Sequence, residues 1–544
     1  MIERLANLID IENRRIFPAR IRVADTQVVA IDPLGNSPDA ELPYALPGFI
    51  DSHVHIESSM LVPTEFARLA VVHGTVATVS DPHEIANVLG VAGVDFMIAN
   101  GHQVPLKFFF GAPSCVPATS FETAGATIDA DAIAALLARD EIVYLAEMMN
   151  YPGVLSGDST VMTKIAHAVA VGKPVDGHAP GLMGEQAAIY AAAGITTDHE
   201  CVTLAEAIGK IAVGMKILIR EGSAAKNFDA LFPLIDRYPG CTMFCSDDKH
   251  PDDLLHSHID ELVRRALNGG ADLFHILTTA CITPVKHYRL PVGLLRVGDP
   301  ADFQIVNNAT EFKNVETVIQ GKPVSQHGVT NIKSFPCESI NHFDCQPKVP
   351  SQFAVPRVGN DTTTKVRVIQ AIDRSLVTGE FTETLNVIDG YVQPAPDRDI
   401  LKLTVVNRYQ SAPPAVAFIN GFGLRKGAIA SSVGHDSHNI LAVGHDDESI
   451  CRAINLVIEN RGGIVAVSGK TELLLPLPIA GLMTQADGAT VAAEYQKIDR
   501  FVKHDLGSPL TAPFTTLSFM ALLVIPKLKL SDLGLFDCET FSLI

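Results

Sequence analysis

Short apolar or β-branched runs that end in polar residues recur through the first half of the chain, and alanine-rich helical stretches separate several of them. Eight such runs cover residues 46–55, 75–81, 106–112, 142–149, 174–178, 195–199, 216–220 and 241–247. Helical patterns intervene at residues 64–72, 131–138, 161–171, 186–193, 204–213 and 228–236. Strands that alternate with helices at this spacing predict a parallel sheet, and eight units over about 200 residues predict a closed (β/α)₈ barrel of the TIM type.

The pattern on either side of these runs is different and predicts further units. Residues 1–45 consist of short strands and turns, and strand texture returns at 291–306. We expect these two parts, 1–45 and 291–345, to form one small β-sandwich domain whose sequence brackets the barrel at 46–290. A polar stretch around 325–356 resembles a linker, and glycine-punctuated strands with helices at 357–544 predict a C-terminal α/β domain.

The composition narrows the class of protein. The chain has 544 residues, 47% hydrophobic and 19% charged, which is typical of a globular protein with a large core. Its 42 Lys and Arg against 61 Asp and Glu give a net charge of −19. That charge argues against a nucleic-acid backbone or an anionic membrane surface as the main partner, and it leaves a neutral small molecule open.

The cysteines and the apolar segments indicate the cellular compartment of the protein. Nine cysteines are scattered without a C-x-x-C pair, which indicates a reduced cytoplasmic protein. The start of the chain lacks the basic and apolar regions of a secretory signal, and the late apolar run at 520–525 is too short to span a bilayer. We therefore expect a cytoplasmic enzyme that does not insert into membranes.

Two histidines at the end of the first run are the sharpest chemical feature. In a strand, residues i and i+2 point to the same face, so His53 and His55 would both project into the barrel mouth. An isolated His-x-His is more often a pair of polar residues at a strand end. Two neutral imidazoles on one face are also a cation site for Zn, Fe or Mn.

Later predicted strands end in the same way, and this favours the metal interpretation. Glu147, His178, His199 and Asp247 close the fourth, fifth, sixth and eighth runs. The carboxyl ends of barrel strands meet at one rim, where such folds hold their active sites. Six potential metal ligands would therefore converge there.

This arrangement resembles the amidohydrolase superfamily, and within it the bacterial adenine deaminases. The motifs that carry this resemblance are HVHIESSM from residue 53, DPHEIANVLG from 81, AEMMN from 146, GHAP from 177, SDD from 246 and GHDSHNI from 434. Many superfamily members bridge two metals with a carbamylated lysine on strand four. Here Glu147 stands at that position, as in the adenine deaminase branch.

The resemblance implies a binuclear site of two divalent metal ions, Mn or Fe, with Zn not excluded. One ion would be held by His53, His55, Glu147 and Asp247, and the other by Glu147, His178 and His199. It also implies hydrolytic deamination of adenine to hypoxanthine and ammonia, a reaction of purine salvage. A metal-activated hydroxide would attack C6, and Asp247 would move the proton to the leaving amine.

Further polar residues are secondary candidates. His83, next to Glu84, is predicted to act as a catalytic proton relay or as an extra metal position. Arg220 ends the seventh run, and we predict a substrate contact, although a surface ion pair explains it equally well. The segment with His435, Asp436, His438 and His445 is predicted to reach over the barrel mouth, where Asp436 and His438 would contact the substrate. Three other histidines are expected at the surface: His250, His256 and His258.

Two alternatives stay open at this stage. One is a cyclic amide or imide hydrolase of the dihydroorotase or hydantoinase type, against which Glu147 and the long C-terminal part argue. The other is a non-catalytic barrel scaffold, against which the complete set of six ligands argues. The expected partners are adenine and water, without nucleic acid or membrane, and a second copy of the chain in a homo-oligomer, a dimer.

Overall fold

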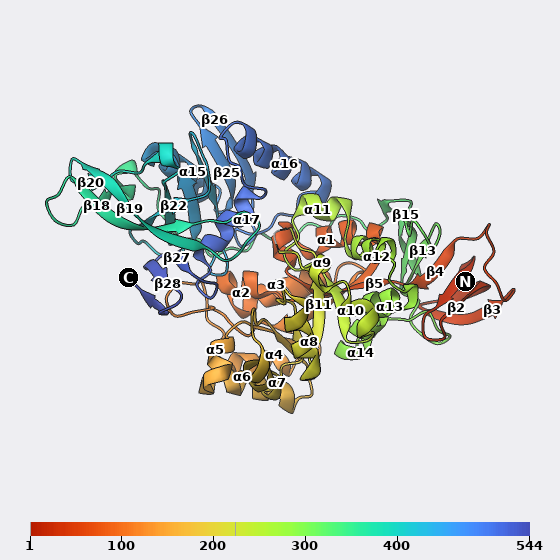
Figure 1. Cartoon of the computed structure of the whole chain (residues 1–544). Coiled ribbons are helices and arrows are strands. Elements are labelled where there is room, and N and C mark those ends of the chain that lie inside the picture. Colours follow the sequence, from red (N-terminus) through yellow and green to blue (C-terminus); the bar gives the residue numbers. More distant parts are fainter. Residues whose placement is uncertain (1, 224) are drawn as a thin grey trace.

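The computed structural model describes residues 2–223 and 225–544. The chain is elongated, with the N-terminal sheet at one end, the parallel strands and their helices in the middle and the C-terminal region at the other end (Figure 1). Among the described residues, none of the helices combines the length and the apolar character that a membrane crossing requires.

Each of the eight predicted runs contains a strand. They are β5 (Phe49–Val54), β6 (Thr75–Ser80), β7 (Lys107–Ala112), β8 (Ile142–Met148), β9 (Val175–Gly177), β10 (Thr197–Asp198), β11 (Lys216–Arg220) and β12 (Thr242–Cys245). The first five form one parallel sheet and the last three another. Parallel bridges join Val175 to Ile195 and Val54 to Asp247, so the strands curl until β12 lies beside β5.

Helices cover the outside of this curled parallel sheet. Those expected from the sequence are α1 (Pro63–Ala70), α4 (Ala130–Leu137), α6 (Ser159–Ala170), α7 (Gly184–Ala192), α8 (Leu204–Ala212), α9 (Phe228–Leu231) and α10 (Leu234–Arg237). The sequence did not predict α2 (His83–Leu89), α3 (Val91–Gly101), α5 (Tyr151–Ser156), α11 (Pro251–His256), α12 (Ile259–Asn268), α13 (Leu273–Leu277) or α14 (Thr283–Tyr288). In α2 even the polar residues His83, Glu84 and Asn87 are buried, so the helix lacks the polar face on which an amphipathic pattern depends.

The N-terminal strands pair with strands from beyond residue 300. The sheet has the order β16-β15-β14-β13-β4-β1-β2-β3. Its strands are β1 (Ile2–Asp10), β2 (Arg15–Ala24), β3 (Gln27–Pro33), β4 (Tyr44–Pro47), β13 (Phe303–Val306), β14 (Asn314–Ile319), β15 (Lys322–Gln326) and β16 (Val329–Thr330). We expected a β-sandwich, but β4 pairs with β1 on one edge and β13 on the other, so the two halves form one continuous sheet.

The C-terminal region is built on a ten-stranded sheet. The strands in spatial order are β17 (Val355–Pro356), β20 (Tyr391–Val392), β19 (Gly379–Ile388), β18 (Thr363–Gln370), β22 (Ala415–Asn420), β21 (Leu401–Val406), β24 (Ile440–Gly444), β23 (Ala428–Ser431), β25 (Gly463–Ser468) and β26 (Thr471–Pro476). Three helices pack with it: α15 (Asp447–Glu459), α16 (Gly488–His504) and α17 (Pro513–Ser518). A small sheet of β27 (Leu528–Ser531), β28 (Gly534–Asp537) and β29 (Ser542–Leu543) follows.

Two histidines expected at the surface are buried. His258 is fully buried; its Nε2 lies 2.7 Å from Asp51 Oδ2 and its Nδ1 lies 2.7 Å from Thr75 Oγ1. His250 is also buried, with its Nδ1 2.8 Å from the hydroxyl of Tyr495 on α16. The expectation was wrong for both because distant segments supply their polar partners, whereas His256 is exposed as expected.

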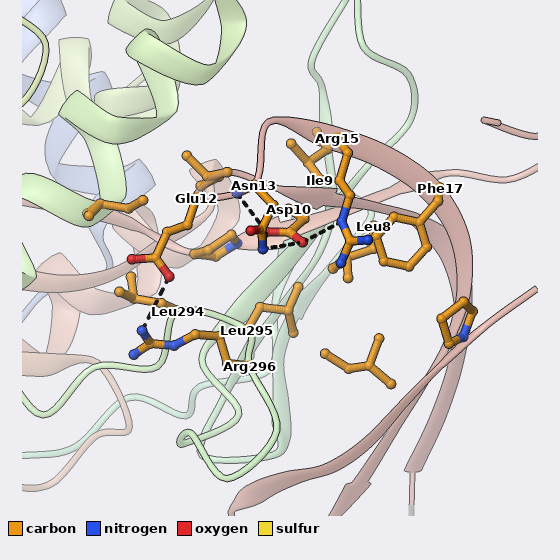
Figure 2. Close-up of a pocket in the computed structure, with 15 residues that line it drawn as sticks. Leu8, Ile9, Asp10, Glu12, Asn13, Arg15, Phe17, Leu294, Leu295 and Arg296 are labelled. Carbon is orange, nitrogen blue, oxygen red and sulfur yellow. Dashed lines mark hydrogen bonds and ion pairs between the residues drawn. The ribbon is translucent and has the colours of Figure 1, made fainter. Parts of the chain in front are cut away.

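A pocket of about 260 Å³ lies between the β1–β2 hairpin and residues 294–296 (Figure 2). Its charged side chains pair with one another: Arg15 Nε lies 2.9 Å from Asp10 Oδ2, and Arg296 Nη1 lies 3.4 Å from Glu12 Oε2. These groups therefore satisfy each other, and the predicted site residues all lie elsewhere.

A buried carboxyl group joins the parallel-strand body to the C-terminal region. Glu122 follows β7, and its Oε2 lies 2.6 Å from the hydroxyl of Ser437, which donates to it. Burial raises the pKa of Glu122 to about 8. The ionised form is therefore costly at this junction.

Replacing Glu122 by glutamine is expected to change the pH dependence of stability. The folded wild type holds this proton up to about pH 8, whereas the unfolded chain releases it near its ordinary pKa of about 4.3. Wild-type stability therefore falls as the pH rises through this window, by roughly 1.4 kcal/mol per pH unit. The free energy of unfolding of Glu122→Gln relative to wild type should rise between pH 5 and pH 8 in urea denaturation. The exposed Glu41→Gln should show no such trend, and a trend shared by both variants would contradict the prediction.

Candidate metal centre

Strand ends bring the predicted ligands together. His53 lies within β5 and His55 follows it, Glu147 lies near the end of β8, and His178, His199 and Asp247 come directly after β9, after β10 and shortly after β12. Because these strands run parallel, their carboxyl ends open to the same side. The six side chains converge on one buried cluster in which each is at most 8% exposed.

The two oxygens of Glu147 face different partners. Oε1 lies 3.2 Å from His55 Nε2 and 3.9 Å from His53 Nε2. Oε2 lies 2.7 Å from His178 Nδ1 and 3.2 Å from His199 Nε2. The carboxylate therefore stands between two groups of imidazoles, as a bridging ligand would.

Asp247 completes the first group. Its Oδ1 lies 3.2 Å from His55 Nε2 and 3.5 Å from His53 Nε2. Ligand atoms about 2.0–2.2 Å from a common cation stand roughly 3.0–3.5 Å apart. The spacing of these nitrogens and oxygens fits that requirement.

The hydrogen-bonding of the histidines also fits a divalent cation. His53 is fully buried, and neither of its ring nitrogens has a hydrogen-bond partner among the described residues. A buried imidazole in that condition needs another partner. The Nδ1 of His55 lies 3.2 Å from the carbonyl of Asp81, which leaves Nε2 directed at Glu147 and Asp247. The donor set of imidazoles and carboxylates suits Mn, Fe or Zn.

The electrostatics keep the two carboxylates ionised. Burial alone would raise the pKa of Glu147, but His178 and His199 hold it well below its ordinary value. Burial would also raise the pKa of Asp247, yet Arg220 and His53 hold it well below its usual range. Both groups are therefore available as anionic ligands at neutral pH.

Arg220 ends β11, and both of its Nη atoms pair with carboxylates, whereas its buried Nε has no hydrogen-bond partner among the described residues. Its Nη1 lies 2.6 Å from Asp247 Oδ2 and also pairs with Glu200, whose Oε2 lies 3.2 Å from Arg220 Nη2. The guanidinium therefore fixes the oxygen of Asp247 that faces away from His53 and His55. The substrate contact predicted for Arg220 stays a prediction.

The C-terminal region contributes three predicted residues to the same rim. His435 Nδ1 lies 2.6 Å from Glu84 Oε1, and His438 Nε2 contacts Glu84 Oε2. The Oδ1 of Asp436 lies 3.9 Å from His83 Nε2. By contrast, His445 is 37% exposed and pairs with Asp446, away from this cluster.

His83 lies between these residues and the cluster of the six predicted metal ligands. Its Nδ1 lies 3.1 Å from Asp81 Oδ2 and 3.6 Å from Glu147 Oε1, while Nε2 lies 3.5 Å from Glu84 Oε1. Burial raises the pKa of Asp436 to about 6, with His83 opposing that rise. Burial alone would lower the pKa of His435, but Glu84 raises it to about 9.

Comparison with known proteins adds independent information. The model of the amidohydrolase family matches residues 44–324, and that of the adenine deaminase C-terminal domain matches residues 375–542. The adenine deaminase of Salinibacter ruber is 55% identical over 99% of this chain and 97% of its own length. That of Sulfurovum sp. is 54% identical over 100% of this chain and 99% of its own length. The chain belongs to the adenine deaminase family.

Comparison with solved structures gives only limited similarity. The β-aspartyl dipeptidase of Fervidobacterium islandicum covers 61% of this chain and 99% of its own, with 14% identity and a TM-score of 0.47. At this level the likeness adds nothing about function.

Sequence reasoning missed two carboxylates of this cluster, Asp81 and Glu200. Asp81 opens the DPHE motif and faces His83, and Glu200 directly follows His199. Glu200 Oε1 lies 3.6 Å from His178 Nδ1 and 3.4 Å from His199 Nε2. Burial would raise the pKa of Glu200, but Arg220 lowers it. Its place next to a strand-end histidine was the signal that could have identified it.

Proposed function

We propose that the chain catalyses the hydrolytic deamination of adenine to hypoxanthine and ammonia at a centre of two divalent cations, as a step of purine salvage. Membership of the adenine deaminase family supports the substrate. The observation that carries the chemistry is the carboxylate of Glu147, whose two oxygens face His53 and His55 on one side and His178 and His199 on the other.

The proposed ligands follow this geometry. His53, His55, Glu147 and Asp247 would hold one cation, and Glu147, His178 and His199 the other, with Mn or Fe as the proposed metals. When bound, such cations supply a water whose pKa falls from 15.7 to roughly 7. Asp247, ionised and beside His53 and His55, would take the proton of the attacking water and hand it to the amine that leaves C6 as ammonia.

The remaining predicted residues have proposed roles on the substrate side. His83 lies between Asp81 and Glu84, so its imidazole can pass a proton from one carboxylate to the other. Asp436 and His438 would contact the purine from the C-terminal side, with His438 orienting Glu84. Arg220 would influence the substrate indirectly, because it holds the carboxylate of Asp247 in place.

The domain organisation that we propose is a (β/α)₈ barrel at 46–290, a small β domain from 1–45 and 291–345, and a C-terminal α/β domain at 357–544 that closes over the site. The two parallel bridges at Val54–Asp247 and Val175–Ile195 support closure of the barrel. Contacts of His435 and His438 with Glu84 support closure by the C-terminal domain. A homodimer and a cytoplasmic location stay predictions.

The decisive experiment measures ammonia and hypoxanthine released from adenine by the manganese-loaded protein, together with its metal content. Ammonia from adenine at two metal ions per chain is the expected result. Hydrolysis of a cyclic imide without action on adenine would instead favour the dihydroorotase or hydantoinase alternative. Absence of both metal and activity would favour a non-catalytic scaffold.

Replacing Asp436 by asparagine tests the proposed purine contact. The variant loses the carboxylate that faces His83, so KM for adenine should rise roughly threefold to tenfold, the range expected for one hydrogen bond. Steady-state kinetics should show a smaller change in kcat. His445→Asn changes a residue of the same part of the chain that does not reach the site, and its KM should match wild type. Equal KM values for Asp436→Asn and wild type would refute the contact.

A further inference from the structure

The metal centre lies beneath an apolar cover from the C-terminal region. Leu376, Phe519, Leu522 and Ile525 line the same pocket as Glu147 and the histidines, and they pack against one another. The pocket has a volume of about 30 Å³, roughly the share of one water molecule in the liquid, whereas small-molecule sites usually have about 300–1,000 Å³. In this conformation the cover leaves less room above the metal centre than a small-molecule site usually has.

A cleft between the barrel and the C-terminal region leads towards this cover. It has a volume of about 540 Å³, and its walls include Ser223, His250, Arg374 and Tyr495. A narrow pocket of about 20 Å³ shares Ser223 and Arg374 with the cleft, and it shares Leu376 with the pocket of the metal centre. Leu376 therefore stands at the junction between the cleft and the site.

A buried lysine joins the two segments that make the cover. Lys529 on β27 is fully buried, and its Nζ donates hydrogen bonds to the carbonyl of Leu376 at 2.9 Å and to that of Phe519 at 2.9 Å. Within the described part of the chain, no carboxylate forms an ion pair with it. Burial lowers its pKa to about 7.

Burying an amine without a counter-ion costs free energy unless hydrogen bonds offset it. Those hydrogen bonds go to the backbone of two segments that are far apart in sequence, and both segments carry side chains that wall the metal pocket. Lys529 therefore links the backbone of the Leu376 segment to that of the Phe519 segment.

We propose that Lys529 is a positioning residue for the reaction, because it ties the Leu376 segment to the Phe519 segment and so holds the apolar cover over the metal centre. This inference rests on the proposed function for its substrate. The proposed role of Lys529 also implies that the cover limits the access of small molecules to the metal ligands. This second implication does not depend on the identity of the substrate.

The test compares Lys529→Met with Lys402→Met in the full-length, manganese-loaded protein. Lys402 is the control, because it is also a buried lysine (4% exposed) and lies in a different part of the C-terminal region. It donates to the carbonyl of Phe353 at 3.0 Å and to Asp447 Oδ1 at 2.7 Å. The readouts are the rate at which EDTA removes manganese, the hydrogen exchange of residues 519–525, and KM against kcat for adenine.

Lys529→Met should lose manganese to EDTA at least roughly tenfold faster than wild type, since two buried hydrogen bonds are removed. Hydrogen exchange at 519–525 should accelerate with it, and KM should rise more than kcat falls. Lys402→Met should resemble wild type in all three. The proposal would be overturned if the two variants had equal rates of manganese removal by EDTA and equal rates of hydrogen exchange. This holds even if the Tm of both variants is lower than that of wild type.

Two further comparisons keep the test decisive if Lys529→Met does not fold. Lys529→Gln retains N–H donors and should show an acceleration below the roughly tenfold expected for Lys529→Met, and a tenfold or larger acceleration would overturn the proposal. Leu376→Ala trims the cover itself, whereas Val377→Ala trims its 45%-exposed neighbour. Equal EDTA rates for these two would also overturn it. Removal of the metal by EDTA does not require turnover. If the wild-type protein failed to deaminate adenine, that result would refute the proposed function but not the proposed role of Lys529.

Discussion

Asp247→Asn is expected to lower kcat for adenine deamination by roughly 10³-fold or more, with the fold intact. Proton transfer by a positioned side chain contributes typically about 10²–10⁴-fold, and this variant also weakens a ligand of the cation site. An amide can neither accept the proton of the attacking water nor neutralise Arg220, whose Nη1 lies 2.6 Å from the lost oxygen. Backbone strain is not expected, because asparagine adopts the left-handed φ of 53° at this position as readily as aspartate.

The measurement is ammonia release by manganese-loaded protein whose circular dichroism and Tm match those of wild type. Asp236→Asn removes the same charge from the surface, where Asp236 pairs with His275, and it should retain full activity. Wild-type-like turnover in folded, manganese-loaded Asp247→Asn would refute the assigned role of Asp247.

Glu147→Gln is expected to lose the metal centre itself. The amide presents one oxygen and one N–H₂ group, so it could coordinate only one of the two cations, whereas Oε1 and Oε2 now face one group of ligands each. Loss of a partner outside the coordination sphere already costs about 10–100-fold in metal affinity. Removing a carboxylate that serves both cation positions should therefore weaken manganese binding by more than roughly 100-fold and abolish turnover.

Metal content after dialysis against a graded series of free manganese concentrations measures this effect directly. The matched control is Glu141→Gln, since Glu141 directly precedes β8 and is exposed. Its manganese affinity should equal that of wild type. Retention of two tightly bound manganese ions by Glu147→Gln would contradict the bridging role.

The two outcomes separate the roles of neighbouring carboxylates. Asp247→Asn should retain most of its metal, because His53, His55 and Glu147 remain, and it should fail mainly in turnover. Glu147→Gln should fail first in metal content. Both carboxylates are held ionised by positively charged or imidazole neighbours, so neither effect should depend strongly on pH near neutrality.

The sequence by itself determined the strands and the ligands that end them. Side chains alternate along a strand, and parallel strands present their carboxyl ends at one side. Six residues were therefore predictable as one cluster: His53, His55, Glu147, His178, His199 and Asp247. Of the helices that were missed, α2 and α3 have few of the exposed polar positions that sequence periodicity requires.

Only the tertiary structure decided which distant segments close around that cluster. Glu84 meets His435 and His438, Glu200 meets Arg220, and Lys529 joins Leu376 to Phe519. Such contacts depend on how whole domains pack and on which polar groups are buried together. The spacing of residues along the chain does not predict such contacts. For this reason His258 was expected at the surface, although it is buried and contacts Asp51 and Thr75.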